Sequence, residues 1–434
     1  MADYIWKKES TTDVDDQVMA FLAGNDVTLD RQLLPFDIRA SQAHARGLAR
    51  IGVLSPEQAE SMCRSLNELA EAFDQGAFIL DQRFEDGHSA IEAWLTERLG
   101  EVGGRIHAGR SRNDQVAVAL RLYLKDRLAR LARVCGEIAG VGLKRAEQES
   151  SMPLPGHTHL QQAMPSSLGL WWAGHAEAFI DNVALAQQTV GWLDGSPLGT
   201  ASGFGVNLPL DRDGVAAELG FERLVVNPQY AQNARGKVEL RALDALAAAT
   251  GDLRRLAWDL SLFASQEFGF VKVPAEFCTG SSIMPNKHNP DTVELLRSLH
   301  ALVAGARMEL ESVLSLPSGY QRDLQDTKPP LIRSFERGLS GLSLVPALLQ
   351  GLVWQPQRMH TAITHELHAT DRANELVGEG KPFRDAYRAA AADLAGLSQR
   401  EPKDSLNARV SLGGCGNLGL DRLEKRLSLL MDQP

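Results

Sequence analysis

Residues 112–150 read RNDQVAVALRLYLKDRLARLARVCGEIAGVGLKRAEQES, and this stretch decides the fold. It contains no proline, and its apolar residues recur three and four positions apart, as in Val116, Leu120, Leu124, Leu128 and Leu131. That spacing places them along one face of an α-helix. The uninterrupted pattern is longer than most globular helices, so it predicts a long helix that packs against several others.

Further proline-free segments repeat this pattern over residues 166–194, 230–268, 291–316 and, more briefly, 331–345. Alternating period-two runs are scarce, so we expect an all-α chain with a central bundle of long helices rather than a doubly wound sheet. Helices with apolar residues on more than one face need partners on several sides, which favours assembly of several chains.

Shorter amphipathic segments flank this core. They predict helices over residues 37–51, 56–73, 89–99, 357–363, 371–379, 383–397 and 418–431. We divide the chain into an N-terminal helical region (1–107), a central long-helix bundle (108–356) and a small C-terminal helical region (357–434).

The composition limits the function classes. The chain has 434 residues, a net charge of −10 and no basic run, so we expect no nucleic-acid partner. Residues 1–8 lack the apolar core of a signal peptide, and no run approaches the ~18 apolar residues of a membrane span, which predicts a cytoplasmic protein without a membrane partner. The cysteines are far apart, so we expect small buried thiols at Cys63, Cys135, Cys278 and Cys415.

Residues 280–290 read G-S-S-I-M-P-N-K-H-N-P. Their hydroxyls, the Lys287 ammonium and the Asn289 carboxamide suit a substrate carboxylate that gains negative charge during reaction. A polar turn before the next helix is the alternative. The pattern G-S-S-x-M-P-x-K-x-N-P resembles the signature of the fumarase/aspartase superfamily, whose members eliminate a group from a succinyl unit and release fumarate.

Residues 108–115, A-G-R-S-R-N-D-Q, open the first long helix. Ser111 followed by Asp114 three positions later is typical of a capping box. Two arginines and an asparagine at the positive end of a helix also predict anion binding, so Ser111, Arg112 and Asn113 are substrate-binding candidates. The run G-R-S-R-N-D-Q resembles the motif of the argininosuccinate lyase family, which narrows the superfamily to one branch.

Residues 155–161, P-G-H-T-H-L-Q, form a Gly/Pro-bounded segment with two histidines. An imidazole titrates near neutrality and suits proton transfer to a leaving nitrogen, but the spacing alone does not choose between His157 and His159. The family reads G-Y-T-H-L-Q. The resemblance therefore assigns the catalytic histidine to His159, and it implies substrate contacts for Thr158 and Gln161.

Two further segments resemble family elements. Residues 85–89, E-D-G-H-S, match E-D-x-H-S, which implies that His88 lines the pocket, although Asp86 and Ser89 can equally cap a helix. Residues 318–328 match Y-x-[KR]-D-x-Q-x-x-K, which contacts the substrate from a neighbouring subunit. The implied substrate-binding residues in this second element are Tyr320, Arg322, Gln325 and Lys328.

No metal-ligand spacing and no phosphate-binding glycine loop occurs, so we expect neither a metal nor a cofactor. The resemblance spans essentially the whole chain. It implies a homotetramer with shared active sites that cleaves the small molecule argininosuccinate into fumarate and L-arginine. The alternatives are another fumarate-releasing lyase, such as adenylosuccinate lyase, fumarase or aspartase, and a non-catalytic, crystallin-like scaffold, which would be expected to have lost the catalytic residues.

The resemblance also implies a division of catalytic work. Ser281 abstracts a proton next to a carboxylate, Lys287 and Asn289 stabilise the carbanion that forms, and His159 assists departure of the guanidino nitrogen. The reverse assignment, with histidine as the base and serine as the donor, is not excluded by the sequence.

Two segments depart from the family pattern. Residues 6–10 read W-K-K-E-S where the family commonly has W-G-G-R-F, and alignment on Asp30 puts Asp26 where a substrate-contacting serine usually lies. An ionised aspartate repels a carboxylate that serine would bind. Either Asn25 or Thr28 replaces the serine, or this segment binds a cation. We expect altered contacts at the arginine end of the substrate and unchanged chemistry at the fumarate end.

Overall fold

The computed structural model describes residues 18, 21, 24–397 and 400–432. The departure at residues 6–10 and the signal-peptide prediction therefore lie outside the described residues. Helices form most of the described chain, which confirms the all-α class. Among these residues, no helix is long and apolar enough to cross a membrane.

The long helices lie where the sequence predicts them. They are α6 (Arg112–Gln148), α7 (Leu168–Leu193), α10 (Lys237–Phe263), α11 (Asp291–Val313) and α12 (Lys328–Gly351). The predicted 230–268 helix is wrong in one respect: it divides into α9 (Pro228–Asn233) and α10. The break falls at Gly236, where φ is 75° and an added Cβ would lie 2.0 Å from the Leu314 side chain. No other residue type fits that backbone without strain.

Two compact units alternate along the chain. The first comprises residues 1–129, 187–245 and 304–336, and the second comprises 130–186, 246–303 and 337–434. The division into three sequence regions remains a prediction.

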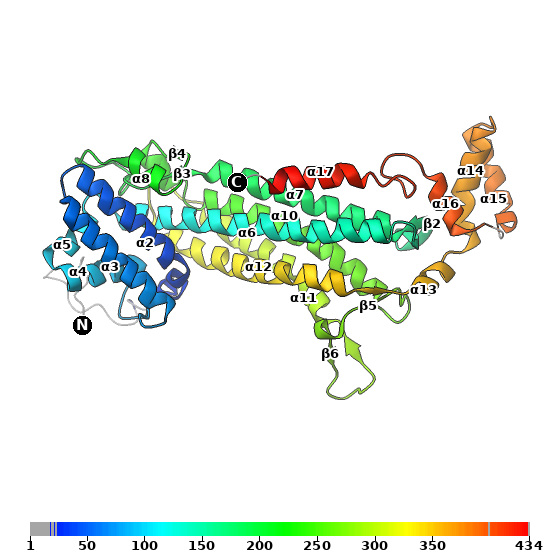
Figure 1. The fold of residues 1–434 in the computed structure, drawn as a ribbon, viewed down its shortest axis with the longest axis horizontal. Coiled ribbons are helices and arrows are strands. Elements are labelled where there is room, and N and C mark those ends of the chain that lie inside the picture. The colour runs from blue at the N-terminus through cyan, green and yellow to red at the C-terminus, as the bar shows by residue number, and fades with distance from the viewer. Residues whose placement is uncertain (1–17, 19–20, 22–23, 398–399, 433–434) are drawn as a thin grey trace. The chain divides into compact units, whose positions relative to one another are not determined.

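The first unit contains a layer of helices packed on one another, as Figure 1 shows for α2, α3 and α4. Its smaller elements are α2 (Asp26–Arg50), α3 (Pro56–Asp74), α4 (Gly87–Leu99), α5 (Glu101–Gly104), η1 (Arg105–His107), β3 (Gly195–Ser196), α8 (Arg212–Glu218), β4 (Arg223–Leu224), α9 and η3 (Arg322–Thr327). Strands β3 and β4 pair in parallel. Leu34, Met62, Leu66 and Ile91 lie at the centre of this layer, each 1% exposed or less. Helix α2 begins at Asp26 rather than at residue 37, so the predicted boundary is wrong.

The second unit contains the short antiparallel hairpins of the chain. Its elements beside the long helices are β1 (Pro153–Thr158), β2 (Gln161–Ser167), β5 (Val271–Lys272), η2 (Ala275–Phe277), β6 (Thr279–Gly280), β7 (His288–Asn289), β8 (Val353–Trp354), α13 (Pro356–Thr361), η4 (His365–His368), α14 (Ala369–Gly378), α15 (Phe383–Ala392), η5 (Ala395–Leu397), α16 (Pro402–Ala408) and α17 (Leu420–Met431). Strand β1 pairs with β2, β5 with β8 and β6 with β7. The hairpin β1–β2 and helix α16 are not anticipated by the sequence, and the predicted 383–397 helix ends at Ala392.

The four cysteines are free. Cys63 and Cys135 are buried, as predicted, whereas Cys278 and Cys415 are only partly buried.

Candidate active site

The first unit contains a cavity lined by charged groups, which we call the charged cavity. It brings together the predicted site residues Arg112, Asn113, Tyr320, Arg322, Gln325 and Lys328. The other lining residues are Asp26, Glu85, Asp86, Val116 and Arg235. Its volume is about 160 Å³. Complete ligand pockets usually measure roughly 300–1,000 Å³, so this cavity accommodates one end of a small molecule.

The N-terminus of α6 forms one wall of the charged cavity. Ser111 N donates to Asp114 Oδ1 at 2.9 Å, and Asn113 N donates to Ser111 Oγ at 3.3 Å. Ser111 therefore caps α6 as predicted, but its Oγ accepts from the second helical residue rather than from Asp114 N, as a full capping box would require. The second carboxylate oxygen of Asp114 accepts 2.9 Å hydrogen bonds from Gly199 N and Ala201 N. Asp114 is fully buried and therefore fixes the start of α6 against the 199–201 loop.

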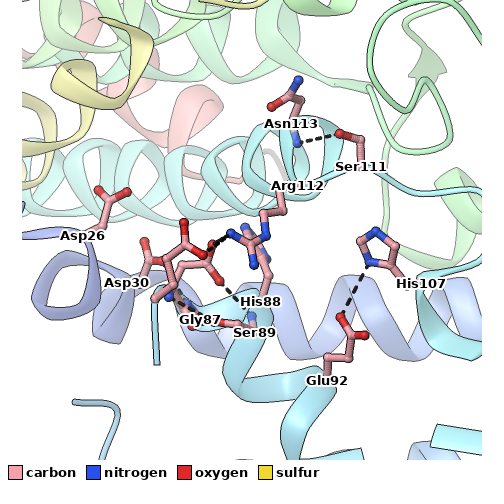
Figure 2. Close-up of polar contacts among 12 residues, drawn as sticks. Asp26, Asp30, Gly87, His88, Ser89, Glu92, His107, Ser111, Arg112 and Asn113 are labelled. Carbon is pink, nitrogen blue, oxygen red and sulfur yellow. Dashed lines mark hydrogen bonds and ion pairs between the residues drawn. The ribbon is translucent and has the colours of Figure 1, made fainter. Parts of the chain in front are cut away.

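Arg112 is neutralised by the protein itself. Its guanidinium lies 2.6 Å from Glu85 and 3.4 Å from Asp86. Figure 2 shows the Arg112 side chain directed from α6 toward His88 and Ser89 at the start of α4. Asp86 in turn caps α4, because Ser89 N donates to its Oδ1 at 2.7 Å while Asp86 N donates to Ser89 Oγ. Burial opposes ionisation of Asp86, but His88 and Arg112 lower its pKa. Arg112 is thus part of a paired charge cluster rather than an isolated anion receptor.

Lys328 lies between two carboxylates of α2. Its Nζ is 2.9 Å from Asp26 Oδ1 and 3.0 Å from Asp30 Oδ1, and its side chain is only 3% exposed. Asp30 Oδ2 accepts a 3.0 Å hydrogen bond from Gly87 N, so Asp30 joins Lys328 to the start of α4. Burial disfavours a charged lysine, but Asp30 and Asp26 outweigh it and raise the pKa of Lys328. Asp26, the departure noted in the sequence, therefore has an internal counter-ion.

His88 is buried and does not line the charged cavity. Its Nδ1 pairs with the carboxylate of Asp37. Burial opposes protonation, yet Asp37, with Asp86 and Asp30, raises the pKa of His88. The pair with Asp37 therefore gives His88 a structural role, in which it holds α4 against α2.

In the second unit, the segment with two histidines is a tight hairpin rather than a loop. His159 and Leu160 connect β1 to β2, with φ values of 55° and 58°. Two consecutive left-handed residues are typical of a type I′ turn. His159 is exposed at the tip, next to Thr158 and Gln161, which face each other across the hairpin. The His157 ring instead packs edge-on against Phe268, with centroids 5.8 Å apart.

The signature loop, residues 281–287, closes the β6–β7 hairpin, which projects from the helices of the second unit in Figure 1. Ser281 Oγ accepts hydrogen bonds from Met284 N at 3.0 Å and Ile283 N at 3.3 Å. Lys287 N donates to Met284 O at 3.1 Å, which tightens the turn, and the Lys287 side chain is exposed. Within the described chain, no hydrogen bond or ion pair joins this loop to the His159 turn.

Arg235 is a lining residue that the sequence reasoning misses. It is buried and lies 3.3 Å from Glu239, which holds its guanidinium at the cavity wall. The signal was the A-R-G run at residues 234–236, since glycine commonly ends or interrupts a helix. Interpreting residues 230–268 as one helix concealed it.

Comparison with known proteins identifies close relatives over the full length. A family model described as lyase matches residues 10–305. The argininosuccinate lyase of Xanthomonas oryzae pv. oryzae strain PXO99A is 56% identical over 432 residues, 99% of this chain and all of that protein. The argininosuccinate lyase of Stenotrophomonas maltophilia strain R551-3 is 55% identical over 431 residues, again 99% of this chain and all of the relative.

Solved structures share the fold at low identity. EDDS lyase in complex with formate superposes with a TM-score of 0.80 at 22% identity, covering 97% of this chain and 92% of that one. The 3-carboxy-cis,cis-muconate lactonizing enzyme from Pseudomonas putida gives a TM-score of 0.72 at 19% identity, covering 96% and 98%. These likenesses establish the fold.

Proposed function

The chain belongs to the argininosuccinate lyase family, whose reaction eliminates fumarate from argininosuccinate to give L-arginine, and we propose how its residues divide that reaction. It is a carbon–nitrogen lyase of arginine biosynthesis. The observation that carries this conclusion is the 56% identity over 99% of the chain, in a sequence that contains Ser281, His159, Lys287 and Asn289. Their presence argues against a non-catalytic scaffold.

We assign proton abstraction to Ser281. A hydroxyl is a weak base, so it must act as an oxyanion stabilised by hydrogen-bond donors. The two backbone N–H groups of Ile283 and Met284 already donate to Oγ, which supports this assignment. The electron pair of the broken C–H bond forms the fumarate double bond, and the C–N bond to the guanidino nitrogen breaks. Lys287 and Asn289 stabilise the negative charge that develops on the neighbouring carboxylate.

We assign protonation of the departing nitrogen to His159. Its place at an exposed turn tip leaves the imidazole available to a substrate, whereas the His157 ring is occupied by Phe268. Non-glycine residues held in the left-handed region cost about 1–3 kcal/mol each, and such strain clusters at functional sites. The alternative with His159 as base and Ser281 as donor uses the same atoms in reverse.

We place the arginine end of the substrate in the charged cavity. Asn113, Tyr320 and Gln325 provide neutral hydrogen-bonding groups there, beside Arg322 and Lys328. Arg112 shapes this wall through its pairs with Glu85 and Asp86. The remaining substrate-binding assignments follow the family resemblance and comprise Ser111, Thr158 and Gln161. His88, which the resemblance also implies, is buried away from the charged cavity, so we assign it a positioning role through its pair with Asp37.

We further propose a cytoplasmic homotetramer with active sites shared between subunits. Large apolar side chains are exposed on long helices: Leu295 at 63% and Leu302 at 50% on α11, and Trp258 at 50% on α10. Residues seven apart share a helix face, and an apolar face of this kind needs a covering partner. A shared site also accounts for a charged cavity too small for the whole substrate. The contributions are residues 110–114, 156–161 and 280–289.

Ultraviolet detection of released fumarate tests this proposal. The purified protein should cleave argininosuccinate in preference to adenylosuccinate, malate or aspartate, and preference for one of these would refute the assignment. Ser281→Ala should lower kcat by about 10³-fold or more while KM changes little. Ser61→Ala, which removes a hydroxyl from the surface of α3, serves as the matched control. Near-normal kcat in Ser281→Ala would exclude Ser281 as the base.

A further inference from the structure

The ion cluster formed by Asp26, Lys328 and Asp30 carries an unbalanced charge. One ammonium faces two carboxylates at 2.9 and 3.0 Å, so the three groups together carry a net charge of −1 when all are ionised. Buried charges normally occur in balanced sets, because an uncompensated charge in a poorly solvated site is costly. This cluster is therefore arranged to accept one more positive charge.

The excess negative charge is accessible at Asp26 rather than at Asp30. Asp30 uses both oxygens inside the protein, one for Lys328 and one for Gly87 N, and it is 3% exposed. Asp26 uses Oδ1 for Lys328, lines the charged cavity, and has a side chain 17% exposed. Among the described residues, Asp26 Oδ2 has no hydrogen-bond partner.

The electrostatics of Asp26 agree with an incompletely balanced carboxylate. Burial raises its pKa, and the neighbouring Asp30 and Asp86 act in the same direction, against the opposing effect of Lys328. A ligand cation bound to Asp26 Oδ2 relieves that repulsion, since an opposite charge in contact favours the ionised form.

The chemistry of the substrate identifies this cation, given the proposed function. Argininosuccinate has two cationic groups, the guanidinium and the α-ammonium of its arginine end. The guanidino nitrogen carries the bond that breaks, so this group must lie with Ser281 and His159. The group that remains for the charged cavity is the amino-acid end, where an ammonium and a carboxylate share one carbon.

We propose that Asp26 is a specificity-determining residue that binds the α-ammonium of the arginine end through its Oδ2, while Lys328 binds the α-carboxylate. The ammonium of Lys328 has three donors, of which Asp26 and Asp30 take two, and it lines the same cavity. Adjacent opposite charges on the protein thus match adjacent opposite charges on the ligand. Asp30 is a positioning residue, because it holds Lys328 without lining the cavity. The enzyme accordingly selects substrates with a free α-amino group.

Two substrates test this inference: argininosuccinate, and its analogue acetylated on the α-amino nitrogen. The wild type should show a kcat/KM for the free amine about 100-fold higher or more. Asp26→Asn keeps the shape but removes the charge, and it should reduce this preference by about 10- to 100-fold, mainly through KM. An unchanged preference in Asp26→Asn, or a wild type that does not discriminate, would overturn the proposal. Fumarate release from argininosuccinate by the wild type reports on the proposed function separately.

A deaminated analogue, with hydrogen in place of the amino group, excludes simple steric rejection of the acetyl group and should be rejected in the same way. Asp30→Asn distinguishes a specificity role of Asp26 from an indirect effect through a disturbed Lys328. It should slow cleavage of all substrates by a common factor and leave the preference intact, so a lost preference would place the discrimination in Lys328 instead. Asp213→Asn, an exposed carboxylate of α8, is the matched charge control. The thermal midpoint and the oligomeric state of each variant verify that it is folded.

Discussion

Replacing Asp114 should destabilise the protein more than replacing an ordinary helix-capping residue does. Its carboxylate accepts hydrogen bonds from three backbone N–H groups, those of Ser111, Gly199 and Ala201, each at 2.9 Å, and it is fully buried. A buried N–H that loses its acceptor costs about 1–3 kcal/mol. Because the losses of neighbouring hydrogen bonds are not additive, we expect Asp114→Ala to lower the free energy of unfolding by about 3–5 kcal/mol. Asp114→Asn keeps one acceptor oxygen and should cost about half as much.

Hydrogen exchange detected by mass spectrometry provides a local readout for this prediction. Peptides covering residues 199–201 should exchange at least about 10-fold faster in Asp114→Ala, since 1.4 kcal/mol corresponds to a factor of ten. Asp211→Ala is the matched control: Asp211 caps α8 through Gly214 N but is only partly buried, so its loss should cost about 1 kcal/mol. If Asp114→Ala costs no more than Asp211→Ala, then the buried carboxylate does not join α6 to the 199–201 loop as argued.

Two further predictions concern the backbone and the pH dependence of stability. Gly236→Ala should lower the free energy of unfolding by well over 2 kcal/mol, because a φ of 75° is combined with a 2.0 Å approach of the added Cβ to Leu314. Gly52→Ala is the control: its φ is 76° but the space around it is open, so it should lower that free energy by only about 1–2 kcal/mol. Equal thermal midpoints for the two variants would contradict this. The pKa of His88 is higher in the folded protein than in the unfolded chain, where it is about 6.5. The stability that comes from its pair with Asp37 is therefore fully present below about pH 6.5, and it is lost as the pH rises through the folded-state pKa. The difference in thermal midpoint between wild type and His88→Gln should therefore be larger at pH 6 than at pH 9, and an equal difference at both would disprove the charged pair.

The parts of the fold that the sequence predicts well are those governed by local periodicity. Helix α6 begins at the predicted residue, because its repeat is long and its cap, Ser111, has a clear signature. The start of α2 is missed because Pro35 interrupts the pattern, although the helix continues through it. The β1–β2 hairpin is missed because its turn contains His159 and Leu160 rather than the glycine or asparagine that such turns usually need.

In the candidate site, too, the sequence predicts what depends on neighbouring residues and misses what depends on contacts between distant residues. Motifs identify residue types that act together, and six of the predicted residues indeed share the charged cavity. They do not reveal which charges neutralise one another. Lys328 and Asp30 are 298 positions apart in the chain, and no local pattern couples them. An arginine or lysine in a motif therefore predicts that the residue lies in the site, but it does not predict that its charge is available to the ligand.

This pairing changes how the site of an acidic chain binds a polyanionic substrate. Arg112 is matched by Glu85 and Asp86, Arg235 by Glu239, and Lys328 by Asp26 and Asp30. A cavity of unpaired cations would bind any small dicarboxylate, including the product fumarate. Paired charges instead offer little net attraction to a simple anion, because the charges of Arg112, Arg235 and Lys328 are already neutralised by neighbouring carboxylates. They bind preferentially a ligand that presents positive and negative groups at matching positions. The amino-acid end of argininosuccinate has this arrangement and fumarate does not, so under the proposed assignment the paired cluster favours argininosuccinate over fumarate at this end of the site.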